Sequence, residues 1–145
     1  MFTHILLPSD GSELSAAAIS HGLNLAKKLG ARVTAFHARP PFHVFSTRTE
    51  MVEDTREQFE RDAKLHAKEV LDGIAKRAAE AGVPCDTEAA VSDHPYEAII
   101  AAALKNGCDL IVMASHGRRG VQALLLGSET QKVLTHSRIP VLVSR

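Results

Sequence analysis

A glycine-containing segment in the last third of the chain carries residue types that could bind a phosphate group. It runs Ala114-Ser-His-Gly117, then nine residues, then Gly127-Ser128, between an apolar stretch and a helical pattern. Glycines let backbone N–H groups approach an anion without an intervening Cβ, and a helix N-terminus favours negative charge. The Ser128 hydroxyl can donate to a phosphate oxygen or help to hold a metal ion. The simpler alternative is that these glycines only build a tight loop and a helix start.

Other chemistry is poorly supported by the residues. The signatures GxxxxGK[ST], GxGxxG, HExxH and GxSxG are all missing, although the chain has eight histidines. The groups near the glycine segment that could assist phosphoryl transfer are His116 and Glu129. Glu129 would repel phosphates unless its carboxylate points away or meets Mg²⁺. The pattern therefore allows slow hydrolysis of a bound phosphoanhydride but does not predict an efficient enzyme.

A second candidate residue follows the first apolar run. The segment Pro8-Ser-Asp10-Gly11 closes a short strand pattern, and Ser12 is a suitable N-cap for the helix that follows. Because Ser12 can cap this helix, we expect Asp10 to be free for a ligand rather than needed as the cap.

Strand and helix patterns alternate along the whole chain, and their order indicates where these candidates lie. The expected strands cover 4–7, 32–37, 87–91, 109–114 and 139–143, and the expected helices cover 12–30, 52–81, 94–106 and 128–136. The run 109–114 is apolar on both faces, which is typical of a central parallel strand. The order predicts an α/β fold: a single doubly wound, Rossmann-like domain over residues 1–145, with a five-stranded parallel sheet and helices on both faces. Ligands of such sheets bind at the carboxyl ends of the strands, where both candidate segments lie.

Two helical patterns carry more detailed expectations. In the first helix, the residues expected to face the core are Leu14, Ala17, Ala18, His21, Leu25 and Leu29. The second helix would be about 45 Å long at 1.5 Å per residue, more than a small sheet requires, so its first part is expected to project or to be broken. A further hypothesis makes residues 39–55 a mobile flap beside the ligand, with Phe42 and Phe45 in contact with it.

Composition excludes several classes of partner. Lys plus Arg and Asp plus Glu are 17 each, and the longest basic run is Arg118-Arg119, so binding to nucleic acid is not expected. No apolar run approaches the roughly 20 residues of a membrane span, and the N-terminus lacks the features of a signal peptide. Cys85 and Cys108 are far apart and fit reduced thiols, so a cytoplasmic location is expected.

The glycine segment, the last strand pattern and the first strand–helix junction together resemble the universal stress protein family. The resemblance rests on 114–120, on Leu125-Leu-Gly-Ser128, on Ile139-Pro-Val-Leu-Val143 and on Pro8-Ser-Asp-Gly-Ser12, and it covers the length and element order of the chain. The ATP-binding branch of that family carries G-x2-G-x9-G-[ST]. Gly117, Gly127 and Ser128 match this motif, whereas Ala114 replaces its first glycine. Alanine is the smallest replacement, so the resemblance still implies nucleotide binding.

The resemblance also implies a role for each matching residue. Asp10 would contact the nucleoside with Pro8 and Ser9 beside it, Ala38 would line the adenine pocket, and Met113 and Ala114 would lie under the nucleoside. The residues that would surround the triphosphate, largely through backbone N–H groups, are His116, Gly117, Gly127, Ser128, Glu129 and Thr130, with Arg118 within reach of a phosphate.

As a whole, the resemblance implies an ATP-binding regulatory protein of the stress response, with Mg²⁺ accompanying the triphosphate. Family members commonly dimerise through their last strand, so residues 141–143 are expected to pair across a two-fold axis. Two alternatives stay open: an ATP-independent protein-interaction module of the same family, and a weak ATPase.

Overall fold

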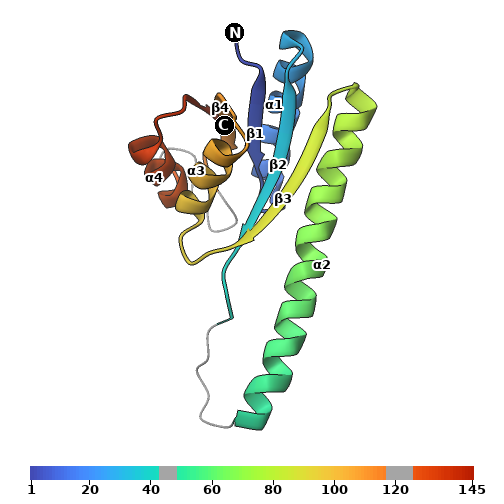
Figure 1. The fold of residues 1–145 in the computed structure, drawn as a ribbon, viewed down its shortest axis with the longest axis vertical. Coiled ribbons are helices and arrows are strands. Elements are labelled where there is room, and N and C mark those ends of the chain that lie inside the picture. The colour runs from blue at the N-terminus through green and yellow to red at the C-terminus, as the bar shows by residue number, and fades with distance from the viewer. Residues whose placement is uncertain (43–48, 117–125) are drawn as a thin grey trace.

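The computed structural model describes residues 1–42, 49–116 and 126–145, without the side chains of 49–54. Within these residues, strands and helices alternate from end to end (Figure 1). In chain order they are β1 (His4–Pro8), α1 (Glu13–Leu29), β2 (Arg32–Arg39), α2 (Thr49–Ala81), β3 (Cys85–Val91), α3 (Pro95–Lys105), β4 (Leu110–Ala114), α4 (Ser128–His136) and β5 (Val141–Ser144). The expected order of elements is confirmed.

The strands form one parallel sheet in the order β3-β2-β1-β4-β5. The chain builds the sheet from β1 outward to β3 and then crosses to β4 on the other side of β1. The strand order therefore reverses between β1 and β4, as it does in doubly wound sheets. This confirms the α/β, Rossmann-like fold. The apolar run in β4 does lie inside the sheet, but β1 and not β4 occupies the middle position.

Helices cover both faces of the sheet, and alternate strand residues divide between two cores. On one face, Ile5, Val33 and Val112 pack against α1 and α2. On the other face, Leu6 and Ile111 pack against α3 and α4. All five residues of β1 and all five of β4 are buried, because each of these strands has neighbours on both edges and helices on both faces.

The helix starts and stops follow the expected local chemistry. The Ser12 hydroxyl accepts a hydrogen bond from Ser15 N–H at 3.2 Å, which confirms Ser12 as the N-cap of α1. Gly30 ends α1 with φ 67°, a conformation that favours glycine. β5 begins two residues later than expected, because Ser137 Oγ bonds both the N–H and the carbonyl of Ile139 and holds that residue in a turn.

The expected buried face of α1 is right only in part, because Ala18 is buried and Leu25 packs against the core but Ala17 and His21 are exposed. The face turned to the sheet consists of Ser15, Ala18, Ile19, Gly22, Leu23 and Ala26, whereas Leu14 and Leu29 are exposed. Four of these six residues are small, and at Gly22 α1 lies so close to the sheet that an added Cβ would overlap Leu7. Size at the contact, rather than hydrophobicity alone, selected the face.

The α2 helix is continuous over 33 residues and runs well beyond the sheet (Figure 1). It therefore projects and is not broken. Near its projecting half, Phe42 lies against Phe59 with ring centroids 5.3 Å apart, and Arg39 bonds Glu60 at 2.8 Å. Phe42 is thus turned toward α2. Phe45 and the rest of 43–48 lie outside the described residues, whereas residues 49–55 of the proposed flap belong to α2. The flap stays a hypothesis.

Asp109 ties the N-terminus of the chain to the start of β4. Its carboxylate accepts hydrogen bonds from Thr3 N–H at 2.9 Å, from the Thr3 hydroxyl at 3.0 Å and from His4 N–H at 3.0 Å. Partial desolvation raises the pKa of Asp109, but these hydrogen bonds outweigh it, so the pKa lies below its ordinary 3.8. A depressed pKa means that the carboxylate stabilises the fold above that ordinary value and loses this effect as pH falls through the folded-state value.

We expect Asp109→Asn to lower the free energy of unfolding at pH 7 by about 1 kcal/mol, a modest value because the site is partly exposed. The amide NH₂ would face the N–H donors of Thr3 and His4 in place of an acceptor. Urea denaturation at pH 7 and at about pH 3 measures the effect, and the difference from wild type should shrink at the lower pH. A difference that is the same at both pH values would contradict this account.

Within the described residues, no helix is long and apolar enough to cross a membrane. Both cysteines are free. Cys108 is buried, and desolvation raises the pKa of its thiol to about 11, so the reactive thiolate is scarce at neutral pH.

Candidate functional site

A cavity of about 410 Å³ opens at the carboxyl ends of β1 and β4, where the strand order reverses. This is the position at which open α/β sheets bind ligands, and the volume falls in the range of small-molecule sites. Its wall combines apolar side chains from the sheet and α3 with polar groups from the β1–α1 turn and the start of α4. The lining residues are Pro8, Ser9, Asp10, Ser15, Phe36, Ala38, Pro95, Ile99, Met113, Ala114, His116, Gly127, Ser128, Glu129 and Thr130.

The cavity is lined by eleven of the thirteen residues that were predicted from the sequence to form the site. These are Pro8, Ser9, Asp10, Ala38, Met113, Ala114, His116, Gly127, Ser128, Glu129 and Thr130. Gly117 and Arg118 lie outside the described residues. Shared lining places these residues around one cavity; it does not test what each of them binds.

Four lining residues were not predicted from the sequence: Ser15, Phe36, Pro95 and Ile99. Phe36 could have been found from Ala38, because residues two apart in a strand lie on the same face. Pro95 and Ile99 belong to α3, and nothing in the sequence indicates that this helix lines the cavity. Ser15 is in the first turn of α1 and reaches the cavity because α1 begins directly after the β1 loop.

The β1–α1 turn is held by its own polar side chains. Ser9 Oγ accepts a hydrogen bond from Gly11 N–H at 3.1 Å and contacts Ser15 Oγ at 2.5 Å. Asp10 Oδ1 accepts from Ser12 N–H at 2.9 Å. The expectation that Ser12 would leave Asp10 free is therefore only half right, since both side chains help to start α1. An Asx turn explains the difference, because Asp accepts readily from the N–H two residues ahead.

His37 supports this turn from the opposite face of β2. The Nδ1 atom of His37 lies 2.8 Å from the Ser9 carbonyl, which can only accept, so Nδ1 carries the proton. Its ring meets His66 of α2 edge-on at 5.5 Å. The backbone at Ser9 is thereby fixed on the side away from the cavity.

The end of β4 and the start of α4 are joined by two hydrogen bonds. Gly127 N–H donates to the Ser115 carbonyl at 2.7 Å, and the Thr130 hydroxyl donates to the Ala114 carbonyl at 2.9 Å. These bonds aim the N-terminus of α4 at the cavity. Gly127 is the N-cap and has no side chain that could accept from the first-turn N–H groups. The α4 N-terminus can therefore receive an anion from the cavity.

Gly127 is not required here for a left-handed backbone. Its φ is −61° and its ψ is 153°, an extended conformation that other residues adopt. Glycine at residue 127 instead leaves the N-terminus of α4 without a side chain that would cover it.

His116 has a buried ring atom without a partner among the described residues. The side chain is 9% exposed, and Nδ1 lies 3.0 Å from Ser115 Oγ, whereas Nε2 has no hydrogen-bond partner. A buried polar atom left unpaired costs free energy unless a ligand or water completes it. Because His116 lines the cavity, a ligand there can supply the missing partner.

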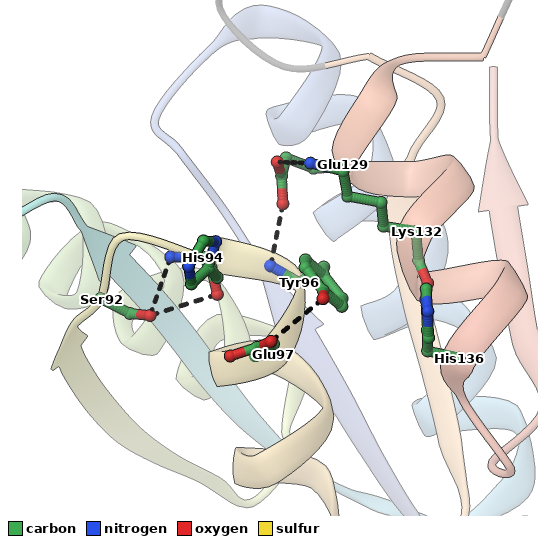
Figure 2. A network of polar contacts seen from close by, with 7 residues as sticks. All are labelled: Ser92, His94, Tyr96, Glu97, Glu129, Lys132 and His136. Atoms are coloured by element: carbon green, nitrogen blue, oxygen red, sulfur yellow. Dashed lines mark hydrogen bonds and ion pairs between the residues drawn. The ribbon is translucent and has the colours of Figure 1, made fainter.

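The Glu129 carboxylate is directed toward the start of α3. Its carboxylate Oε2 accepts from Tyr96 N–H of α3 at 2.9 Å, and Oε1 lies 3.4 Å from Lys132 Nζ (Figure 2). These partners offset part of the negative charge that Glu129 brings to the α4 N-terminus, although the residue itself lines the cavity. Within the described parts of the chain, no group of three His, Cys, Asp or Glu residues is arranged to hold a metal ion.

Comparisons with known proteins agree with this fold. The universal stress protein family profile matches residues 1–145. Universal stress protein MJ0531 of Methanocaldococcus jannaschii is 33% identical over 145 residues, which is 99% of this chain and 82% of that protein. The solved structure of MJ0577, from the same organism, has a TM-score of 0.82 at 29% identity and covers 99% of this chain and 95% of that one.

Two further solved structures carry nucleotides. One is a universal stress protein in complex with cAMP, with a TM-score of 0.72 at 21% identity, covering 99% of this chain and 97% of that one. The other, from Archaeoglobus fulgidus, is in complex with dAMP, with a TM-score of 0.68 at 18% identity, covering 100% and 98%. At these identities the likeness concerns the fold. Because the family profile matches all 145 residues of the chain and a relative is more than 30% identical to it, the chain belongs to the universal stress protein family.

Proposed function

We propose that the protein binds an adenine nucleotide, ATP with Mg²⁺, in the cavity between β1 and β4, and that it acts as a cytoplasmic, homodimeric regulatory protein of the stress response. The observation that carries the proposal is the pairing of an apolar pocket with an anion-accepting helix start. Phe36, Ala38 and Ile99 supply the apolar part, and the uncapped N-terminus of α4 supplies the anion site.

The residues fit a nucleotide on two further counts. The Nε2 atom of His116 has no hydrogen-bond partner among residues 1–42, 49–116 and 126–145, and a polar ligand could provide one. Related proteins of the same fold are known with cAMP and with dAMP bound, and both are adenine nucleotides. Mg²⁺ would be held mainly by phosphate oxygens, with the Ser128 hydroxyl at the helix start as the nearby protein oxygen. The metal would neutralise charge on the phosphates.

A regulatory role fits the site better than efficient catalysis. A phosphoryl-transfer enzyme needs a placed base or water-orienting group. Glu129 was one of two candidates, and its carboxylate is engaged by Tyr96 N–H and Lys132. His116 is then the other candidate, and slow hydrolysis of ATP is the most that we propose.

The dimer is proposed to form through β5, which is an edge strand of the sheet. Leu142 in this strand is 41% exposed, as expected for a residue that a second copy could cover. β5 also lies close to the cavity, because Ser144 pairs with Ala114 in the register of β4 and β5. Occupation of the cavity could thus alter the dimer edge, and sedimentation with and without ATP tests this gating.

We expect Ala114→Val to weaken ATP binding at least tenfold. Ala114 ends β4 on the cavity wall and is 8% exposed, so two added methyl groups have no open space except the cavity or the core. Isothermal titration with ATP, with and without Mg²⁺, measures the effect. Ala89→Val is the matched control. It is the same substitution at an exposed strand position that does not line the cavity.

Two outcomes would contradict the proposal. Equal ATP affinity for Ala114→Val and Ala89→Val would place the nucleotide elsewhere. A folded, nucleotide-free wild-type protein that binds no ATP would favour the alternative of an ATP-independent interaction module.

A further inference from the structure

Helix α3 begins without a local cap. Its N-cap residue is His94, whose side chain makes no capping hydrogen bond, and Pro95 at the first position has no N–H. Tyr96 N–H is therefore the first donor of the helix. The Glu129 carboxylate, 33 residues further along the chain, accepts from it at 2.9 Å (Figure 2). Glu129 thus does for α3 what an N-cap side chain normally does.

This contact joins two walls of the cavity. Pro95 and Ile99 line it from α3, whereas Ser128 and Glu129 line it from α4. The Tyr96 ring is also held by α4, with the His136 ring centroid 5.2 Å away and Lys132 Nζ 5.5 Å from the Tyr96 centroid. Both the backbone and the ring of Tyr96 are therefore attached to α4, and the shortest of these attachments is the Glu129 hydrogen bond.

The contact also decides where the negative charge of Glu129 is directed. One carboxylate oxygen faces the positive end of the α3 dipole, and the other lies 3.4 Å from the Lys132 ammonium. A carboxylate in the first turn of α4 would otherwise stand beside an anion bound at that helix start. Its partners reduce this repulsion.

We propose that Glu129 is a positioning residue of the nucleotide site: its carboxylate caps α3 and sets the separation of the α3 and α4 walls. It is not a ligand of phosphate-bound Mg²⁺. This inference rests on the proposed function, since the walls that it positions are those of the nucleotide cavity.

Three variants separate this role from a metal-binding role. Glu129→Gln keeps an oxygen that can accept from Tyr96 N–H but removes the charge. Glu129→Ala removes both. Glu97→Gln is the matched control. It also removes one negative charge near Tyr96, from the first turn of α3, but leaves the hydrogen bond of Tyr96 N–H to Glu129 in place.

Binding of adenosine and of ATP with Mg²⁺ is measured by titration for each variant. We expect Glu129→Ala to weaken both ligands by about fivefold, which corresponds to the ~1 kcal/mol of a helix N-cap. Glu129→Gln should bind adenosine within about twofold of wild type and ATP equally well or more tightly. Loss confined to ATP with Mg²⁺, in both Gln and Ala variants, would overturn the inference, as would unchanged affinities in Glu129→Ala.

Hydrogen exchange of the Tyr96 amide provides a readout that needs no nucleotide. The amide should exchange at similar rates in wild type, Glu129→Gln and Glu97→Gln, and at least fivefold faster in Glu129→Ala. A wild-type protein that binds neither ligand would overturn the proposed function, and the Tyr96 amide would still decide whether Glu129 caps α3. Equal exchange in Glu129→Ala and wild type would overturn the cap itself.

Discussion

Replacing Gly127 with aspartate is expected to weaken ATP binding by about 30- to 100-fold relative to asparagine at the same position. Gly127 is the N-cap of α4, and its extended backbone suits either residue. Two unit charges 4 Å apart interact by about 4 kcal/mol at an effective dielectric constant of 20, and solvent and Mg²⁺ reduce this to about 2.0–2.7 kcal/mol. The Asp carboxylate would therefore occupy the anion site itself and repel the phosphates.

The comparison with asparagine isolates charge from size. Asn and Asp have the same shape, and both are good N-caps, so the free energy of unfolding should be equal to that of wild type or slightly higher in each variant. Titration with ATP and with adenosine measures binding, and urea denaturation checks the fold. The loss in Gly127→Asp should be much smaller for adenosine, which lacks phosphates. If Asp and Asn variants bind ATP equally, the phosphates do not lie at the start of α4.

The largest effect on stability is expected for Gly22→Val in α1. A Cβ at residue 22 would lie 2.3 Å from Leu7 Cδ2 and 3.5 Å from Val112 Cγ1. Leu7 and Val112 are both fully buried, so neither can move aside without disturbing the core. We expect the free energy of unfolding to fall by about 3 kcal/mol, the upper part of the range for overpacked cores.

Gly73→Val is the matched control, because Gly73 is an exposed helical glycine with no atom within 4 Å of an added Cβ. There the better helix propensity of valine should raise the free energy of unfolding by about 0.4 kcal/mol. Urea denaturation followed by circular dichroism measures both variants. Similar changes at residues 22 and 73 would show that the distance between α1 and the sheet is not limiting. Gly22→Ala offers a milder variant if the valine protein does not fold.

The sequence by itself determined the order of elements and most of their ends. Ser12, Gly30 and Pro95 act through their nearest neighbours: a hydroxyl that bonds an N–H three residues on, a residue that tolerates positive φ, and a ring that removes an N–H. Such effects are local, so they can be predicted without knowledge of the fold. The alternation of strands and helices then implied a parallel sheet and a ligand site at its carboxyl edge.

The tertiary structure alone decided which residues face one another across the fold. The buried face of α1 could be predicted only in part from its leucines, because the close approach of α1 to β1 and β4 places small residues such as Ser15 and Gly22 on it. The direction of the Glu129 carboxylate depended on an uncapped helix start 33 residues away. Ile99 joined the cavity because of the path of α3 across the sheet. Contacts between distant segments depend on how the elements pack against one another. A local sequence pattern does not contain the spacing or the direction of that packing.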